Sequence, residues 1–184
     1  MKATAVKPIE NLFLYYKSLG EKAMDQVSDV AMFHTPDDKS NSISVIVKHL
    51  HGNMLSRWTD FLTTDGEKEW RQRDGEFEET LTTRAQVMHL WEEGWKCLFD
   101  ALRSLTDEDL KKVVYIRNMG QPAEEAILRQ LAHYAYHVGQ IVYLARLLNE
   151  GNWTSLTIPK NQSKKFNQER FEKERRLKDF TEDK

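Results

Sequence analysis

The sequence has very little cysteine and no long apolar run. Cys97 is the only cysteine among 184 residues, which excludes an intramolecular disulfide and a zinc site built from several cysteines. No stretch of about eighteen consecutive apolar residues occurs, so we expect no membrane-spanning helix. The first ten residues, MKATAVKPIE, lack the apolar core of a signal peptide. We therefore expect a cytoplasmic protein without a membrane partner.

An excess of charge of one sign is also absent. The chain has 27 basic and 29 acidic residues and a formal net charge of -2 at pH 7, so it offers no overall field that would attract nucleic acid. Hydrophobic residues make up 40% and charged residues 30% of the sequence, as in ordinary globular proteins. A chain of this length can bury a core as a single domain.

The spacing of apolar residues predicts four long helices, over about residues 9–27, 43–62, 83–105 and 124–148. A polar stretch ends at Asn41 and Ser42, which are suitable N-caps for the second of these helices. Thr82 or Thr83 can cap the third helix in the same way.

The connections between the predicted helices differ in character. Residues 63–79 are polar and charged, which predicts a long crossover connection. Residues 113–116 are short and rich in β-branched side chains and precede turn residues, which predicts an extended strand or hairpin. We predict an all-α fold: one antiparallel four-helix bundle over residues 1–160. Residues 161–184 form a strongly charged tail, with a short surface helix or partial disorder.

Two of the six histidines, His133 and His137, are four residues apart in the last predicted helix. Side chains at this spacing lie one turn apart on the same helical face, where two imidazoles can share a metal ion, as in helical HExxH sites. Tyr134 stands where that motif has its glutamate, so a peptidase of that class is not predicted. Solvated helices also carry such pairs by chance, and the main apolar stripe of this helix is centred away from the pair.

A stable site needs a third ligand, and the second predicted helix offers His49 and His51. These two residues point roughly 160° apart on a helix, so they cannot both join one site. His51 lies nearer the apolar stripe, and periodicity slightly favours it without deciding the choice. His34 lies in a polar turn and is expected at the surface, whereas His89 is expected to be partly buried.

Five segments occur in an order and spacing that together are specific. They are residues 41–50, 52–54, 57–62, 129–141 and 153–160, with the sequences NSISVIVKHL, GNM, RWTDFL, RQLAHYAYHVGQI and WTSLTIPK. Together they resemble the DinB/YfiT-like superfamily of metal-binding bundles, and more narrowly an uncharacterised DinB-related family of small bacterial proteins. The resemblance covers nearly the whole chain.

The superfamily pattern is a histidine followed by an aliphatic residue on the second helix and a His-x-x-x-His pair on the fourth. It corresponds here to His49, which Leu50 follows, and to His133 and His137. The resemblance thus selects His49 over His51. It implies one divalent transition metal, and three imidazoles suit zinc or nickel.

Side chains near the ligands should orient the imidazoles, and helical proximity makes Asn53 and Gln140 the candidates. Three protein ligands leave one coordination position open, as in catalytic zinc sites. Characterised members of the superfamily include transferases that use low-molecular-weight thiols. The resemblance therefore implies metal-assisted transfer of a small thiol to a small electrophilic substrate.

Two other hypotheses remain open. The chain could be a metal-dependent hydrolase with metal-bound hydroxide as the nucleophile, or a non-catalytic protein whose metal is structural and whose surface binds a partner. The resemblance also implies a homodimer, and five tryptophans and eight phenylalanines agree with an additional buried surface.

Overall fold

A computed structural model of the chain describes residues 6–149, 151, 153–179 and 181. Helices dominate it, accompanied by two 3₁₀ turns and one small sheet. In chain order the elements are α1 (Val6–Met24), α2 (Asp29–Phe33), α3 (Ile43–Trp58), η1 (Asp74–Phe77), α4 (Arg84–Ser104), η2 (Asp109–Lys111), β1 (Val113–Ile116), β2 (Met119–Pro122), α5 (Ala123–Leu148) and α6 (Ser163–Phe171).

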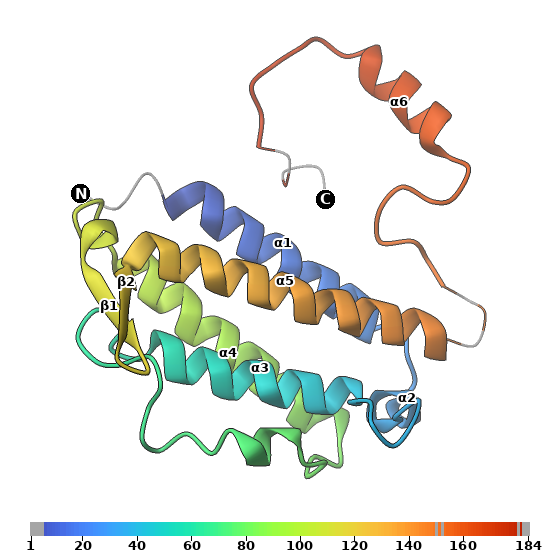
Figure 1. The fold of residues 1–184 in the computed structure, drawn as a ribbon. Helices are drawn as coiled ribbons and strands as arrows, with labels where there is room; N and C mark the ends of the chain where they lie inside the picture. The colour runs from blue at the N-terminus through green and yellow to red at the C-terminus, as the bar shows by residue number, and fades with distance from the viewer. Residues whose placement is uncertain (1–5, 150, 152, 180, 182–184) are drawn as a thin grey trace.

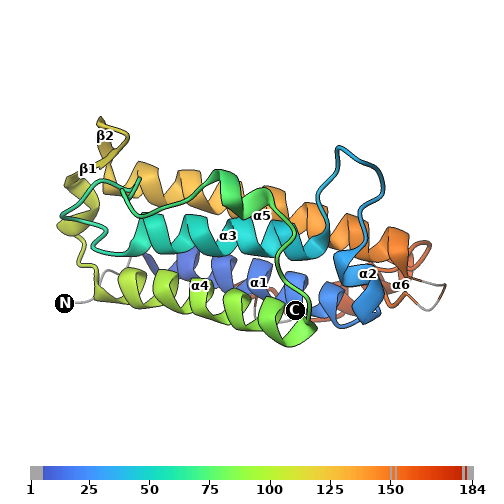
Figure 2. The same cartoon turned by 90° about the horizontal axis from the view of Figure 1, so that it is seen from below.

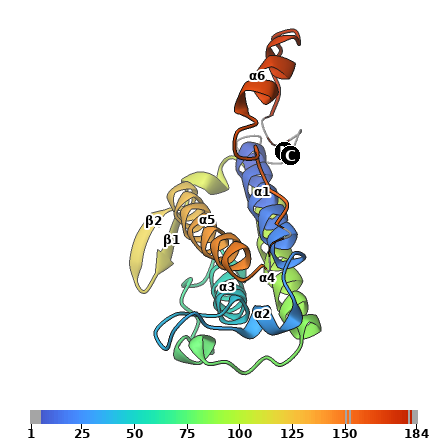
Figure 3. The ribbon, with the colours of Figure 1, turned by 90° about the vertical axis from the view of Figure 1, so that its right-hand side faces the viewer.

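Four long helices, α1, α3, α4 and α5, pack around a shared hydrophobic core. Helix α1 lies beside α5, and α3 lies beside α4 (Figure 1). The helices of each pair run in the same direction, and the two pairs run in opposite directions (Figure 1). Figure 3, which looks roughly along the bundle, shows the four helices grouped around a common axis. The prediction of a mostly helical fold is confirmed.

Aromatic rings from all four long helices meet in the core. Phe13 of α1 lies at the centre, with its ring centroid 6.1 Å from Trp58, 6.2 Å from Trp95 and 5.9 Å from Tyr134. These rings are almost completely buried. Aromatic pairs of this kind contribute about 0.5–1.5 kcal/mol beyond the burial of their surface. The core therefore fixes how α3 and α5, the helices that carry the candidate ligands, lie relative to each other.

The helix starts follow from the capping residues. The Ser42 hydroxyl accepts a hydrogen bond from the backbone N–H of Val45 and begins α3. Thr83 and Gln86 form a capping box at the start of α4, in which each side chain accepts from the other residue's backbone N–H. Both caps were predicted from the sequence and are confirmed.

Two helices end earlier in the structure than the sequence predicts. The first, predicted over 9–27, stops at Met24 and is followed by the separate short helix α2. The second, predicted over 43–62, stops at Trp58 because the backbone becomes extended at Thr59 and left-handed at Asp60, where φ is 48°. Apolar residues beyond Trp58 continued the helical spacing but lie in turns.

The segment predicted to be extended forms β1, which pairs with β2 in an antiparallel hairpin. Arg117 and Asn118 make the turn with φ of 54° and 60°, and positive φ at both central residues is typical of the tight turns that suit a twisted hairpin. The backbone N–H groups of both residues donate to the carboxylate of Asp65, at 2.8 Å each. This contact ties the hairpin to the connection that follows α3.

The long connection between α3 and α4 covers the outer side of α3 (Figure 2). Because α3 and α4 are parallel, the chain must return along α3 before α4 can begin. The turn η1 packs directly on α3, and the connection buries Arg71 and Glu76. Helix α3 is consequently covered on most of its circumference, and its buried residues include polar ones such as His49, Asn53 and Arg57.

The charged tail contains the short helix α6, which buries none of its side chains. It stands apart from the four long helices (Figures 1 and 3). Among the described residues, no helix combines the length and apolarity needed to span a bilayer.

Candidate metal centre

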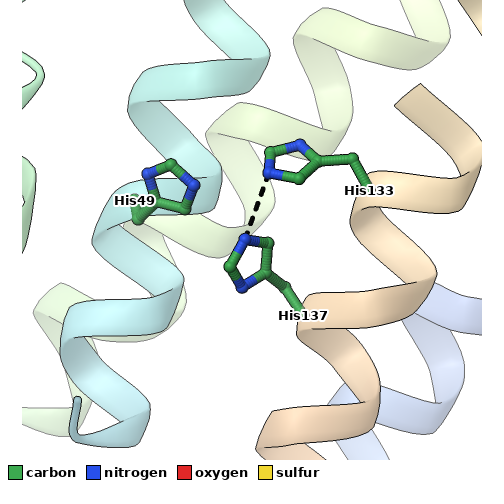
Figure 4. A group of neighbouring side chains, drawn as sticks. All are labelled: His49, His133 and His137. Atoms are coloured by element: carbon green, nitrogen blue, oxygen red, sulfur yellow. Dashed lines mark hydrogen bonds between the residues drawn. The ribbon is translucent and has the colours of Figure 1, made fainter. Parts of the chain in front are cut away.

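Three imidazoles converge in the space between α3 and α5. His49 comes from α3, His133 and His137 come from α5, and their rings point toward one another (Figure 4). One nitrogen from each ring can be chosen so that all three lie within 4.8 Å of one another. Ligand nitrogens about 2 Å from a tetrahedral zinc lie roughly 3.3 Å apart. Small side-chain movements would therefore bring the three rings to metal-binding distances.

His49 is the most enclosed of the three imidazoles, with 5% of its surface exposed. Its Nδ1 lies 2.9 Å from Oε2 of Glu76. Because a carboxylate only accepts hydrogen bonds, Nδ1 carries a proton, which leaves Nε2 as the nitrogen that can bind a metal. A carboxylate behind a ligand histidine is the usual way in which proteins fix the tautomer and orientation of a metal-binding imidazole.

Glu76 is itself fixed by Arg71. The Arg71 Nε donates to Oε1 at 2.7 Å and its Nη2 to Oε2 at 2.9 Å. Burial by itself would raise the pKa of Glu76, but the hydrogen bonds from His49 and Arg71 outweigh burial and lower this pKa. The carboxylate therefore stays ionised at neutral pH and keeps its acceptor role toward His49.

Gly52 makes room for this carboxylate. It lies on α3 one turn after His49, and a Cβ atom at this position would overlap the side chain of Glu76. Any residue larger than glycine would therefore push Glu76 away from His49. Glycine is required here because the Glu76 side chain approaches the helix closely. It is not required for backbone conformation, because the backbone of Gly52 is ordinary helix.

The second ligand candidate with a fixed tautomer is His137. Its Nδ1 donates to Oε1 of Gln140 at 2.8 Å, and its Nε2 lies 3.1 Å from Nε2 of His133. Gln140 thus contacts a candidate ligand. Asn53 lines the same cavity, but its side-chain oxygen accepts from the hydroxyl of Tyr134 at 3.0 Å.

The environment keeps the α5 histidines neutral. Burial, followed by the neighbouring imidazoles His137 and His49, lowers the pKa of His133 to about 3. Burial lowers the pKa of His137 to about 4, although its hydrogen bond with Gln140 acts in the opposite direction. Neutral imidazole is the form that binds metal. The pair is thus in the ligand form at pH 7.

The other histidines lie elsewhere. His51, which periodicity had slightly favoured, pairs with Glu93 of α4 through Nε2 at 2.9 Å. His34 is exposed, as predicted, whereas His89 is also exposed, so the prediction that it is partly buried is wrong. Tyr134 lies in the core, where its hydroxyl accepts from Trp58 Nε1 at 3.0 Å, and burial raises its pKa.

A cavity of about 350 Å³ opens beside the three histidines. Asn53, Gln130 and Tyr136 line it together with five arginines, and none of the described residues that line it is Asp or Glu. The nearest carboxylate on the histidine side, Glu76, is occupied by His49 and Arg71. Sequence reasoning missed Glu76 and the five arginines. Most of these residues lie in connections and turns without periodicity, Arg129 is exposed on α5, and Arg57 is a buried charge on α3 that apolar periodicity does not reveal.

Comparison with known proteins adds one match. The model of a family described as "Protein of unknown function (DUF1572)" matches residues 2–162. No curated protein and no solved structure matches the chain.

The lowered pKa values of His133 and His137 predict that the metal-free protein loses stability in acid. An unfolded histidine binds a proton below about pH 6.5, whereas His133 stays neutral in the fold until about pH 3 and His137 until about pH 4. The unfolded state therefore gains protons first, and stability falls as the pH drops from about 6.5 toward 4. Between pH 7.5 and 5, urea unfolding in a chelator should show a loss on the order of 2 kcal/mol.

A His133→Gln/His137→Gln variant should lose much less stability over the same interval, and His89→Gln should behave as the wild type. Carboxylates such as Glu76, whose pKa is lowered from 4.5, respond only at lower pH. Equal pH dependence in the wild type and the double variant would contradict this explanation.

Proposed function

The chain belongs to the DUF1572 family of proteins of unknown function, and we propose that it is a metal-assisted transferase that joins a low-molecular-weight thiol to a small electrophilic substrate. In this proposal, one divalent transition metal, zinc or nickel, binds to His49, His133 and His137. The observation that carries the proposal is the convergence of these three imidazoles at the wall of a 350 Å³ cavity. Cavities of this size accommodate small molecules.

The same proposal assigns the fold to the DinB-like four-helix-bundle class. The order of the four long helices and the long crossover between α3 and α4 support this assignment. So do the positions of the candidate ligands, one on the second long helix and two on the fourth, with Leu50 directly after His49.

The donor set suits a catalytic metal better than a structural one. Structural zinc sites are normally closed by four protein ligands, whereas catalytic sites keep one position open. Among the described residues, only three side chains form the candidate group. When bound, the metal would supply the positive charge that stabilises a thiolate at neutral pH.

The sulfur nucleophile must come from a co-substrate. Cys97 lies in a different cavity, beside Phe61 and Leu105, and burial raises the pKa of its thiol. In the proposed reaction the thiol loses its proton to solvent, its sulfur forms a bond to the electrophilic carbon, and the leaving group departs with the electrons of the broken bond. The protein contributes position, charge and exclusion of water.

The cavity favours this reaction over hydrolysis. Even with metal-bound hydroxide as the nucleophile, a hydrolase usually needs a group that donates a proton to the leaving group, and carboxyl groups commonly serve this purpose. None of the described residues lining the cavity is a carboxylate. Both oxygens of Glu76 are already engaged by Arg71, and one of them also by His49.

Elemental analysis tests the metal site. The wild-type protein, incubated with zinc or nickel and then dialysed, should retain about one equivalent. His137→Ala should retain little, because two imidazoles remain of three. His51→Ala, whose histidine pairs with Glu93, serves as the control and should retain as much as the wild type. A wild-type protein without bound metal would refute the proposed site.

Replacing Glu76 tests the role of the carboxylate behind His49. Glu76→Gln should weaken zinc binding about 10- to 100-fold, measured by competition with a chromophoric chelator. Gly52→Ala should weaken it as well, because the new Cβ displaces the Glu76 side chain. Glu78→Gln is the matched control, since Glu78 is exposed on the same connection. Unchanged affinity in both Glu76→Gln and Gly52→Ala would mean that Glu76 does not orient His49.

A thiol-dependent assay tests the activity. The metal-loaded protein should accelerate the reaction of a small thiol with monobromobimane, and removal of the metal or His137→Ala should return the rate to background. Turnover of ester probes without any thiol would favour the hydrolase instead. If neither probe turns over and chelation strongly lowers the thermal midpoint, the metal is structural and the transferase proposal fails.

A further inference from the structure

The cavity beside the histidines is strongly basic, although the whole chain has a net charge of -2. Five arginines line it: Arg57, Arg71, Arg73, Arg117 and Arg129. They come from α3, from the connection, from the hairpin turn and from α5. Such a concentration of one charge in a small hollow produces a local field that the overall composition conceals.

Two of these arginines serve the structure itself. Arg57 and Arg71 are buried; Arg57 pairs with Glu67 at 3.1 Å, and Arg71 pairs with both Glu67 and Glu76. Burial, together with the nearby charge of Arg71, lowers the pKa of Arg57. The two carboxylates neutralise these two guanidinium groups, which therefore need no ligand.

The other three arginines are exposed at the mouth of the cavity and are less well compensated. Arg117 reaches Glu67 at 3.2 Å, but this carboxylate already pairs with the two buried arginines. The only ion pair of Arg73 with a described residue is a 3.9 Å contact to Asp74, which is fully exposed. Arg129 makes no ion pair with any residue that the structure describes.

Each of the outer arginines is placed by its surroundings. The guanidinium of Arg73 lies over the ring of Phe77, 5.1 Å from its centroid, and Phe77 in turn stacks on His49 with ring centroids 4.8 Å apart. Arg117 occupies the hairpin turn that Asp65 fixes through the backbone. Arg129 lies one helical turn before His133 on α5. All three line the same cavity as the candidate ligands.

An unpartnered amide points to the same cavity. Gln130 lines it with 5% of its surface exposed, and its Oε1 has no hydrogen-bond partner among the described residues. Buried polar atoms without a partner are uncommon in folded proteins, and a ligand is one way to satisfy them. The cavity therefore offers unused positive charge for an anion and, separately, an unused hydrogen-bond acceptor that suits a hydroxyl or N–H group of the same ligand.

We propose that the small molecule handled at this site carries an anionic group, a carboxylate or a phosphate, that binds to Arg73, Arg117 and Arg129. Guanidinium groups form paired, charge-assisted hydrogen bonds with both kinds of anion. A cavity of about 350 Å³ can hold a small molecule but not a segment of a polymer. The inference rests on the proposed function only for the reacting end of that molecule, which would extend toward the histidines.

Calorimetric titration at low ionic strength tests the anion site with two probes, inorganic phosphate and succinate. Each is titrated into chelator-treated protein and into zinc-loaded, dialysed protein. We expect saturable binding of at least one probe to both forms, weakened by added salt. Stronger binding of phosphate would indicate a phosphate group on the natural ligand, and stronger binding of succinate a carboxylate.

The decisive variant is Arg73→Gln/Arg129→Gln, which removes two exposed charges and leaves the buried pairs intact. It should bind the preferred probe at least about tenfold more weakly, with an unchanged thermal midpoint. Arg146→Gln is the control, because Arg146 is exposed on α5 but does not line the cavity. It should bind as the wild type does.

The outcomes separate this inference from the proposed metal site. Binding that requires zinc and is unaffected by the double variant would mean that the anion binds the metal, which overturns the anion site and supports the metal. Arginine-dependent binding to a protein that retains no metal would support the anion site and refute the metal. No saturable binding of either probe to either form would overturn the inference.

Discussion

The buried carboxylate of Glu76 connects the scaffold of this protein to its candidate site. Arg71 donates to both of its oxygens, and His49 donates to one of them. Taking charges out of water is costly unless partners replace the solvent, so each of these groups depends on the others. Because Glu76 and Arg71 lie in the connection and His49 lies on α3, one network both fastens the connection and orients an imidazole.

This network follows from the topology. Helices α3 and α4 are parallel (Figure 1), so the chain between them has to travel back along α3. A connection that long would ordinarily remain loose. Here it packs η1 against α3 and buries polar side chains that face polar residues of the helix. The connection between α3 and α4 also supplies Glu76 and Arg71, which hold His49 in place. In addition, its residues Arg71 and Arg73 line the basic cavity.

Much of the fold could be predicted from the sequence, because the long helices have clear periodicity and Ser42 and Thr83 are strong caps. The choice between His49 and His51 could not be made this way. Helix α3 is covered on most sides, so an apolar stripe does not mark its buried face. On α5 the apolar stripe was placed away from the histidine pair, yet Tyr134, beside His133, and Ile141, one turn after His137, are fully buried. Glu76 could not be singled out from the sequence, because it is one of many charged residues in a polar connection without periodicity.

The separation of the ligands along the chain has a consequence for folding. His133 and His137 are neighbours as soon as α5 forms, but His49 joins them only after α3, the connection and α4 are in place. Contacts between distant parts of a chain carry the largest entropic cost of loop closure. A metal that prefers three imidazoles to two would therefore bind the completed fold more tightly than any partly folded chain, and its binding energy would add to the stability of the folded state.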